Sequence, residues 1–165
     1  MILSAFLAVT FPALPCAVRT VGPGGGGAII TLCPSRHRAE RLYVATDVGG
    51  FHRSDDFGRH YDVLNAGLGN MYVADIAEHP TDPKSLVIAT KGGLYKTTDA
   101  GLHWKALRSG ARPTPVPDEF GLSWPFAHVA WCESDPSRVW GVSGKYESKQ
   151  VQRGENHPRI WRSDD

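Results

Sequence analysis

Ser54-Asp55-Asp56-Phe57-Gly58-Arg59-His60-Tyr61 and Thr97-Thr98-Asp99-Ala100-Gly101-Leu102-His103-Trp104 are two copies of one eight-residue pattern, and this pattern decides the fold. A third copy starts at Ser163-Asp164-Asp165, the last three residues of the sequence. The copies start at residues 54, 97 and 163, so they are 43 and then 66 residues apart. A recurring pattern at such a spacing indicates a repeat architecture.

The residues ahead of the first two copies align as well. Leu42-Tyr43-Val44-Ala45-Thr46 corresponds to Leu86-Val87-Ile88-Ala89-Thr90, and a Gly-Gly pair follows each stretch. A repeat of roughly 40 to 50 residues is typical of one blade of a β-propeller. The longer third interval is then a blade with extra loops.

The middle repeat shows the expected strands most clearly. Short apolar runs separated by turn residues predict strands at 73–77, 86–90, 94–97 and 104–107, with a turn at 80–83. Four short antiparallel strands make up one propeller blade. We therefore predict an all-β chain, a β-propeller fragment of about three four-stranded blades. A propeller ring takes four to eight blades, so we expect the ring not to close within this chain and the remaining blades of a longer protein to be required.

The eight-residue pattern has a structural explanation. Ser, Thr and Asp side chains can bind backbone amides in a tight turn, Gly adopts a conformation that other residues resist, and the final aromatic can pack over the hairpin. We expect this turn-stabilising role for Ser54, Asp56, Gly58, Tyr61, Thr97, Asp99, Gly101, Trp104, Ser163 and Asp165.

The pattern Ser/Thr-x-Asp-x-Gly-x-x-Trp/Tyr resembles the Asp-box, or BNR repeat, of β-propellers. Sialidases, xyloglucan-degrading glycosidases, sortilin-like receptors and photosystem assembly factors all resemble one another in it. The resemblance therefore implies a fold much more strongly than a function.

Strand direction separates two faces of the predicted propeller. The boxes and the 80–83 turn share one face, whereas the turn at 46–50 and the long segments 108–125 and 145–159 belong to the other. Long, variable loops are where binding and catalysis concentrate. Phe120, Trp124 and Tyr146 on these segments are weak candidates for stacking on sugar rings, and a packing role is the alternative for each.

Asp47 is the candidate catalytic residue on that second face. Its counterpart in the next repeat is Lys91, so the blade itself does not require a carboxylate there. The stretch from Gly24 to Tyr61 resembles the amino-terminal end of xyloglucanase-type glycoside hydrolases, family 74. That resemblance implies an inverting endoglucanase with two propellers, in which Asp47 is the general base and the second carboxylate comes from outside this chain. The alternative is an Asx-type turn that only holds the glycines after it.

Two functional hypotheses follow from the resemblance. The first is the amino-terminal fragment of a secreted glycosidase that acts on a β-glucan such as xyloglucan, with this fragment alone inactive. The second is a non-catalytic secreted binding or assembly module, sortilin-like or similar to the photosystem assembly factors. A sialidase-like propeller is a further alternative, although the Phe-Arg-Ile-Pro motif of sialidases is absent from the sequence.

The amino terminus and the net charge limit where the protein is located and which partners it can bind. Residues 1–17 have the apolar run of a secretory signal peptide and are too short for a secure membrane span, so residues 18–165 are expected outside the cytoplasm, secreted or periplasmic. A net charge of +1 offers no broad basic surface for nucleic acid, which leaves a polysaccharide or glycan as the expected partner.

The cysteines and histidines show no metal-ligand spacing, so we predict neither a metal site nor a cofactor. Cys33 and Cys132 fall in different repeats, at sites too far apart for a disulfide. We predict two unpaired, mostly buried thiols.

Overall fold

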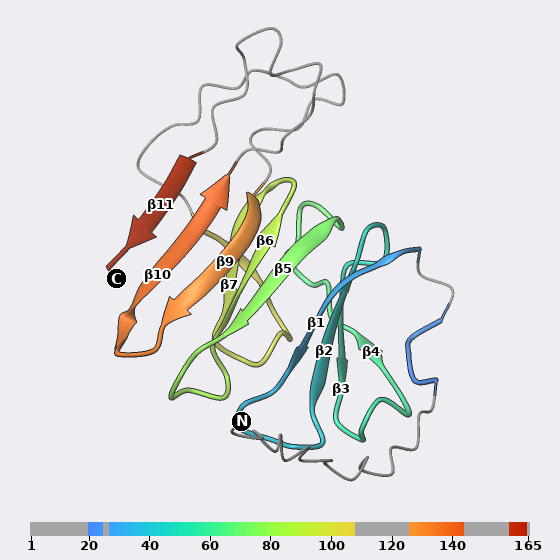
Figure 1. The fold of residues 1–165 in the computed structure, drawn as a ribbon. Helices are drawn as coiled ribbons and strands as arrows, with labels where there is room; N and C mark the ends of the chain where they lie inside the picture. Colours follow the sequence, from blue (N-terminus) through green and yellow to red (C-terminus); the bar gives the residue numbers. More distant parts are fainter. Residues whose placement is uncertain (1–19, 25–26, 108–125, 144–158, 165) are drawn as a thin grey trace, which may run out of the picture.

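The computed structural model describes residues 20–24, 27–107, 126–143 and 159–164. In this part of the chain the regular structure is β-strand, arranged in three separate antiparallel sheets (Figure 1). We call these sheets blade 1, blade 2 and blade 3 in chain order. The all-β fold class predicted from the repeats is confirmed.

Each blade is built from strands that follow one another in the sequence. Blade 1 contains β1 (Ile29–Pro34), β2 (Leu42–Thr46), β3 (Phe51–Ser54) and β4 (Asp62–Val63). Blade 2 contains β5 (Val73–Glu78), β6 (Leu86–Thr90), β7 (Gly93–Thr97) and β8 (Lys105–Ala106). Blade 3 contains β9 (Phe126–Cys132), β10 (Asp135–Ser143) and β11 (Arg159–Ser163).

The strands of blade 2 match the sequence prediction to within two residues at each end. Blade 3 differs from the other two, because its described residues form three strands. In blades 1 and 2 the fourth strand follows the box, whereas in blade 3 the box begins at Ser163, two residues before the end of the sequence.

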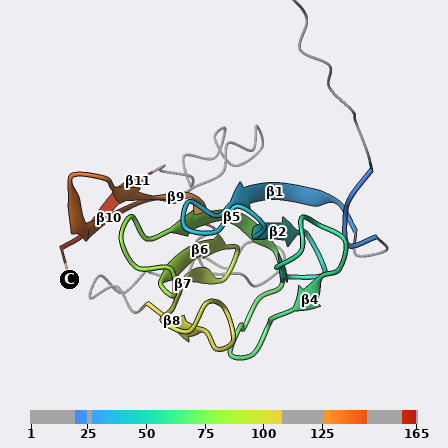
Figure 2. The same cartoon turned by 90° about the horizontal axis from the view of Figure 1, so that it is seen from below.

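The three blades lie side by side in chain order (Figures 1 and 2). Their first strands, β1, β5 and β9, are the inner strands, and β5 contacts both of the others. Blades 1 and 3 lie at opposite ends, so the three blades do not close a ring.

Two hydrophobic clusters fill the joints between neighbouring blades. The joint between blades 1 and 2 is centred on Tyr43, Phe51 and Trp104, with Phe51 and Trp104 edge to face at 4.9 Å between ring centroids. The joint between blades 2 and 3 contains Val87 and Val129. Each blade is therefore stabilised by burying apolar surface against its neighbour.

The strand pairing gives a common register for all three blades. Leu42, Leu86 and Val139 are equivalent, because each pairs with the first residue of a box. By this register Cys132 takes the place of His79 in blade 2, but Cys33 takes the place of Ala77 and so lies two positions earlier.

Both of these cysteines are unpaired, as predicted, but each is only partly buried. Burial raises the pKa of the Cys33 thiol to about 11, so at neutral pH Cys33 remains a protonated and poorly reactive thiol.

Candidate functional site

The turn from Thr46 to Gly50 joins β2 to β3 at the end of the strands away from the boxes. The Thr46 hydroxyl accepts a hydrogen bond from the Gly49 amide at 2.8 Å. The Asn65 side chain closes the turn from the other side, accepting from the Phe51 amide and donating to the Gly49 carbonyl, both at 2.9 Å. Side chains thus hold the turn on both sides and fix the position of Asp47.

The Asp47 carboxylate is half-buried and lies against the segment that leads into β1. Its Oδ1 accepts a hydrogen bond from the Ala28 amide at 2.8 Å, while the Asp47 amide donates to the Ala28 carbonyl at 3.1 Å. Gly27 has φ of 86°, and a side chain on it would collide with Asp47 Oδ1. Oδ2 accepts no hydrogen bond from the described residues. One carboxylate oxygen therefore anchors the turn, and the other has no hydrogen-bond partner among the described residues.

Blade 2 makes the equivalent turn without a carboxylate. There the Thr90 hydroxyl accepts from the Gly92 amide at 3.0 Å, and the Lys91 amide donates to the Tyr72 carbonyl at 3.2 Å. The Lys91 ammonium lies 4.0 Å from the centroid of the Tyr72 ring, a cation–π contact. The backbone connection between turn and inner strand is thus common to both blades, and the carboxylate is particular to Asp47.

Two further charged groups lie on the inner strands near the ends that share the Asp47 side. Asp75 on β5 accepts a hydrogen bond from the Val129 amide at 3.1 Å, and its Oδ2 lies 3.4 Å from Nδ1 of His128 on β9. His128 is exposed, whereas Asp75 is half-buried. Asp75 therefore binds a backbone amide on the edge of β9 that faces away from β10. The sequence pattern does not predict this contact.

The predicted sugar-stacking residues Phe120, Trp124 and Tyr146 lie outside the described residues. The strand ends that flank their segments are described. Leu107 follows β8, and Ser143 ends β10 at the position equivalent to Thr46. Both segments thus leave the described structure on the side that carries Asp47.

In the box turn of blade 1, the Ser54 hydroxyl lies inside the turn, where it accepts hydrogen bonds from the amides of Asp56 and Gly58 and donates to Asp56 Oδ1. Asp56 in turn accepts from the amides of Arg59 and His60. These bonds, first of all that from the His60 amide, hold the pKa of Asp56 well below its usual value.

The box of blade 2 repeats this network. The Thr97 hydroxyl accepts from the Asp99 and Gly101 amides and donates to Asp99, and Asp99 accepts from the His103 amide. The imidazole of His103 also contacts Asp99 Oδ2 at 2.8 Å, as His60 contacts Asp56 Oδ2 at 2.5 Å in blade 1. The carboxylates of Asp56 and Asp99 therefore bind groups within their own box turns.

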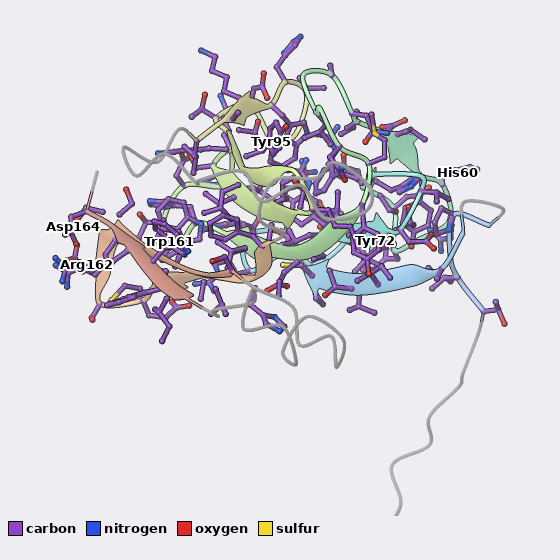
Figure 3. All side chains as sticks on the ribbon, turned by 90° about the horizontal axis from the view of Figure 1, so that it is seen from above. His60, Tyr72, Tyr95, Trp161, Arg162 and Asp164 are labelled. Atoms are coloured by element: carbon purple, nitrogen blue, oxygen red, sulfur yellow. The ribbon has the colours of Figure 1, made fainter. Side chains whose placement is uncertain are left out.

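In the third box, Asp164 pairs with Arg138 at 2.6 Å and with Arg162 at 2.9 Å. Figure 3 shows Arg162 and Asp164 next to each other at one end of the molecule. The predicted box residue Asp165 lies outside the described part of the chain.

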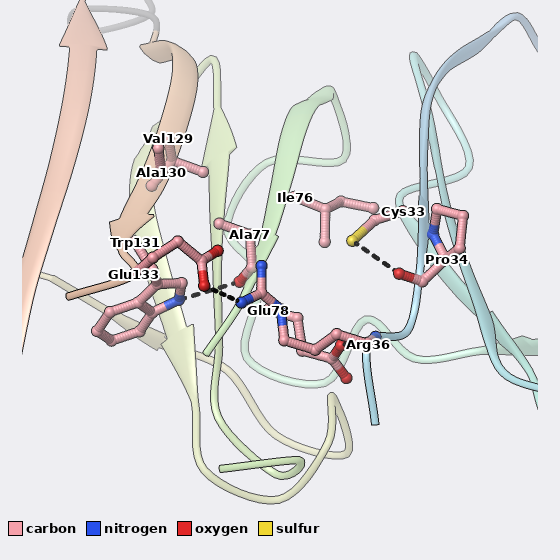
Figure 4. Close-up of a pocket in the computed structure, with 10 residues that line it drawn as sticks. All are labelled: Cys33, Pro34, Arg36, Ile76, Ala77, Glu78, Val129, Ala130, Trp131 and Glu133. Atoms are coloured by element: carbon pink, nitrogen blue, oxygen red, sulfur yellow. Dashed lines mark hydrogen bonds and ion pairs between the residues drawn. The ribbon is translucent and has the colours of Figure 1, made fainter. Parts of the chain in front are cut away.

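A pocket opens between the inner strands β1, β5 and β9 (Figure 4). Glu78 is 3% exposed and accepts hydrogen bonds from the Ser35 hydroxyl, the Arg36 amide and the Tyr43 hydroxyl at 2.8, 2.7 and 3.0 Å. Arg36 and Glu133, which also line the pocket, form an ion pair at 2.7 Å. These polar groups bind one another across the blades, so the pocket serves as a junction between blades. Nothing in the sequence pattern predicts that Glu78 is buried.

Among the described residues, no group of three or more His, Cys, Asp or Glu side chains is arranged to hold a metal ion. The same residues contain no helix long and apolar enough to cross a membrane. The predicted signal peptide, residues 1–17, lies outside the described part.

No protein-family model matches the sequence, and no curated protein matches it. Among solved structures, the chain is similar to an ancestral GH74 enzyme, with a TM-score of 0.61 and 18% identity over 76% of this chain. It is similar to the GH74 enzyme of Niastella koreensis, with a TM-score of 0.57 and 17% identity over 83% of this chain. It is also similar to the GH74 xyloglucanase of Xanthomonas campestris, with a TM-score of 0.53 and 17% identity over 76% of this chain.

The chain spans 14, 21 and 18% of the length of these three structures. Similarity at this level of identity shows a common fold and does not show a common activity. The chain has the fold of part of a β-propeller.

Proposed function

We propose that this chain is part of a secreted propeller glycoside hydrolase that acts on a β-glucan such as xyloglucan. The observation that carries the proposal is the Asp47 carboxylate, whose Oδ1 is held by the Ala28 amide while Oδ2 has no hydrogen-bond partner among the described residues. The equivalent residue of blade 2 is Lys91, so the blade fold does not explain the carboxylate. The similarity of the fold to GH74 enzymes supports the same reading.

The proposed chemistry is inverting hydrolysis of a glycosidic bond. Asp47 Oδ2 accepts a proton from a water molecule as that water attacks the anomeric carbon. A second carboxylic acid protonates the oxygen of the leaving sugar, about 6.5 to 9.5 Å from the first carboxyl group. This acid is supplied by a part of the protein beyond this chain, so the chain alone is expected to be inactive.

The test compares xyloglucan hydrolysis by the full-length protein that carries this chain with hydrolysis by its Asp47→Asn variant. An asparagine keeps an oxygen to accept from the Ala28 amide, so the turn is retained while the base is lost. General base catalysis contributes about 10²- to 10⁴-fold, and kcat should fall by that order. Asp62→Asn, at an exposed position on β4, is the control and should keep the activity of the wild type.

The hydrogen bond between the Ala28 amide and the Asp47 carboxylate also supports a second candidate function. In a non-catalytic secreted module that binds a glycan or assists assembly, Asp47 would only hold the start of β1 to the turn. Full hydrolytic activity in Asp47→Asn would reject the catalytic role. If neither protein hydrolyses the glucan and both bind it equally, the binding module is the function that remains.

A further inference from the structure

His52 on β3 is a buried histidine whose ring has no hydrogen-bond partner. The residue is 5% exposed, and neither Nδ1 nor Nε2 contacts a donor or an acceptor among the described residues. Buried polar groups in folded proteins are normally hydrogen-bonded, so a ring without partners is an exception. The hydrogen bonds that hold the turn around Asp47 do not include this ring.

The ring lies on the side of blade 1 that faces away from blade 2. Phe51, the residue before it, packs into the joint with blade 2, and successive side chains of a strand alternate between the two sides of a sheet. In the strand register His52 is opposite Val44 on β2 and Val63 on β4, which share its side. The histidine therefore has an apolar side chain on each neighbouring strand.

The residues that precede β1 cross this side of blade 1 (Figure 1). At the box end, a methyl group on Gly58 would lie 3.1 Å from Cβ of Val21. At the opposite end, Ala28 forms two hydrogen bonds with Asp47. Residues 20–24 and 27–28 thus connect the box end of blade 1 to the turn that carries Asp47, and β3 with His52 lies between these two ends. We call these residues the crossing segment of blade 1.

Blade 2 shows how the equivalent position acts when it has a partner. The register makes Tyr95 the counterpart of His52. The Tyr95 hydroxyl accepts a hydrogen bond from the Gly69 amide at 3.1 Å, and Gly69 belongs to the residues that lead into β5. This position therefore holds the crossing segment of blade 2 to its blade. In blade 1 the same position carries a histidine, the side chain whose charge ordinarily changes between pH 5 and pH 8.

A proton on the His52 ring would have no compensating charge. Burial lowers the pKa of His52, and no charged group contributes to the shift. Arg53 and Asp62 are opposite each other in the register and so lie on the other side of the sheet. Tyr61 of the box has a buried hydroxyl that also lacks a partner, and the crossing segment contains no titratable side chain. The charged ring is therefore disfavoured as long as it stays buried.

Further blades of a longer protein would not supply the missing partner. Both ring nitrogens are already closed off from solvent, with less than 1 Å² exposed on each atom. A group that approaches blade 1 from outside cannot reach them while the crossing segment stays in place. The inference below therefore holds whether or not another blade covers this side of blade 1.

We propose that His52 is a positioning residue for Asp47. When the ring takes up a proton, the crossing segment separates from blade 1, and the Ala28 amide no longer holds Oδ1 of Asp47. The inference rests on the proposed function only in its consequence, which is that hydrolysis declines on the acid side as Asp47 loses this contact.

The direction of the pH dependence follows from the burial of the ring. Because the ring binds a proton less readily when the segment is docked than when it is released, docking has its full strength above the ordinary pKa of histidine, about 6.5. Docking weakens as the pH falls below that value. At pH 5.5, one unit lower, the docking equilibrium is weaker by up to about tenfold.

The test measures hydrogen exchange of the Ala28 and Asp47 amides in the full-length protein that carries this chain, at pH 7.5 and pH 5.5. Both amides form their hydrogen bonds across the contact between segment and turn. After correction for the intrinsic pH dependence of exchange, their protection in the wild type should fall several-fold, up to about tenfold. His52→Phe keeps a flat ring and cannot take up a proton, so its protection should be the same at both pH values. His52→Tyr, with the residue type of blade 2, should behave in the same way.

The chain offers two matched controls. The Lys91 amide forms the equivalent hydrogen bond in blade 2, to the Tyr72 carbonyl, and its protection should not depend on the charge of His52. His60→Gln removes a histidine of the same blade whose side chain is 89% exposed, and this variant should keep the pH dependence of the wild type.

Three results would overturn the proposal. They are unchanged protection in the wild type, an equal loss of protection in the wild type and both His52 variants, and a loss at Lys91 as large as that at Asp47. The pH profile of kcat for xyloglucan gives a separate readout, in which activity of His52→Phe should extend to lower pH than that of the wild type. If Asp47→Asn is fully active, the proposed function fails, and the exchange measurement still decides the role of His52.

Discussion

Asp99 shows how a single carboxylate holds a box turn. Burial alone would raise its pKa, but hydrogen bonds from the Thr97 hydroxyl and from the amide and ring of His103 lower the pKa of Asp99 to about 2. A carboxyl group whose pKa is lower in the folded chain than in the unfolded chain, where it is about 3.9, stabilises the fold in its ionised form. The stabilisation is complete above that unfolded value and is lost as the pH falls through about 2.

We therefore expect Asp99→Asn to lose stability mainly above pH 4. Urea unfolding of wild type and variant between pH 7 and pH 2 provides the measurement. The difference in free energy of unfolding should be constant down to about pH 4 and should then shrink toward pH 2, because protonation removes the charge that the variant lacks. A difference that stays constant across this range would show that the charge of Asp99 does not stabilise the turn.

The box turn as an element needs two successive left-handed residues, and the sequence indicated only one of them. The glycines Gly58 and Gly101 have φ of 80° and 93°, as the pattern predicts. The residues before them, Phe57 and Ala100, also have positive φ, 62° and 60°. Left-handed conformations are costly for such residues, so no propensity rule would place them there. The side-chain hydrogen bonds within the box hold the turn in this shape.

The same box position has different surroundings in the two blades. A methyl group on Gly101 would lie 2.7 Å from the ring of Phe51 in the core of the joint, whereas one on Gly58 would lie 3.0 to 3.2 Å from Tyr61 and Val21. Both glycine-to-alanine changes should cost about 1 to 2 kcal/mol for the left-handed backbone. Gly101→Ala should cost about 1 to 3 kcal/mol more, because a packed core has no room for the added methyl.

Unfolding of the two alanine variants in urea at neutral pH measures this difference directly. Because the backbone strain is common to both, the difference between them reports how much more the methyl group is crowded by Phe51 than by Tyr61 and Val21. An equal loss of stability in Gly58→Ala and Gly101→Ala would mean that the joint can yield to the extra methyl group.

Much of the arrangement of elements could be predicted because it depends on residues that are close together in the sequence. The Leu86–Thr90 and Gly93–Thr97 strands follow from short apolar runs between turn residues, and the spacing of the boxes set the register of the repeats. The place of Asp47 on the side away from the boxes follows from the alternation of strand direction. Its contact with Ala28 did not follow, because Ala28 lies 19 residues away in a glycine-rich segment without periodicity.

At the scale of the whole molecule, the contacts between blades could not be predicted from the sequence. They join residues far apart in the chain, such as Tyr43 with Glu78 and Asp75 with Val129, and no repeated motif marks them. The register explains why. The position of Glu78 is occupied by Pro34 in blade 1 and by Trp131 in blade 3. Equivalent positions therefore carry different side chains in different blades.

Glu78 and Glu133 offer a direct comparison of a buried and an exposed contact between blades. Glu78 accepts three hydrogen bonds from blade 1, and burial raises the pKa of one donor, Tyr43, to about 12, so that its hydroxyl keeps its proton. Glu133 pairs with Arg36 in an ion pair whose side chains are 69% and 39% exposed. A buried donor left without a partner costs about 1 to 3 kcal/mol, whereas an exposed ion pair contributes about 0 to 1 kcal/mol.

We therefore expect Glu78→Ala to lower the free energy of unfolding by at least about 2 kcal/mol and Glu133→Ala by less than about 1 kcal/mol. Both variants remove one carboxylate that binds Arg36 of blade 1, Glu78 from blade 2 and Glu133 from blade 3, so they differ in burial and in the number of hydrogen bonds lost. Urea unfolding followed by tryptophan fluorescence measures both, since Trp104 and Trp131 lie in the two joints. Similar losses in the two variants would show that the junction around Glu78 is open to water, and that apolar packing alone holds blade 1 to blade 2.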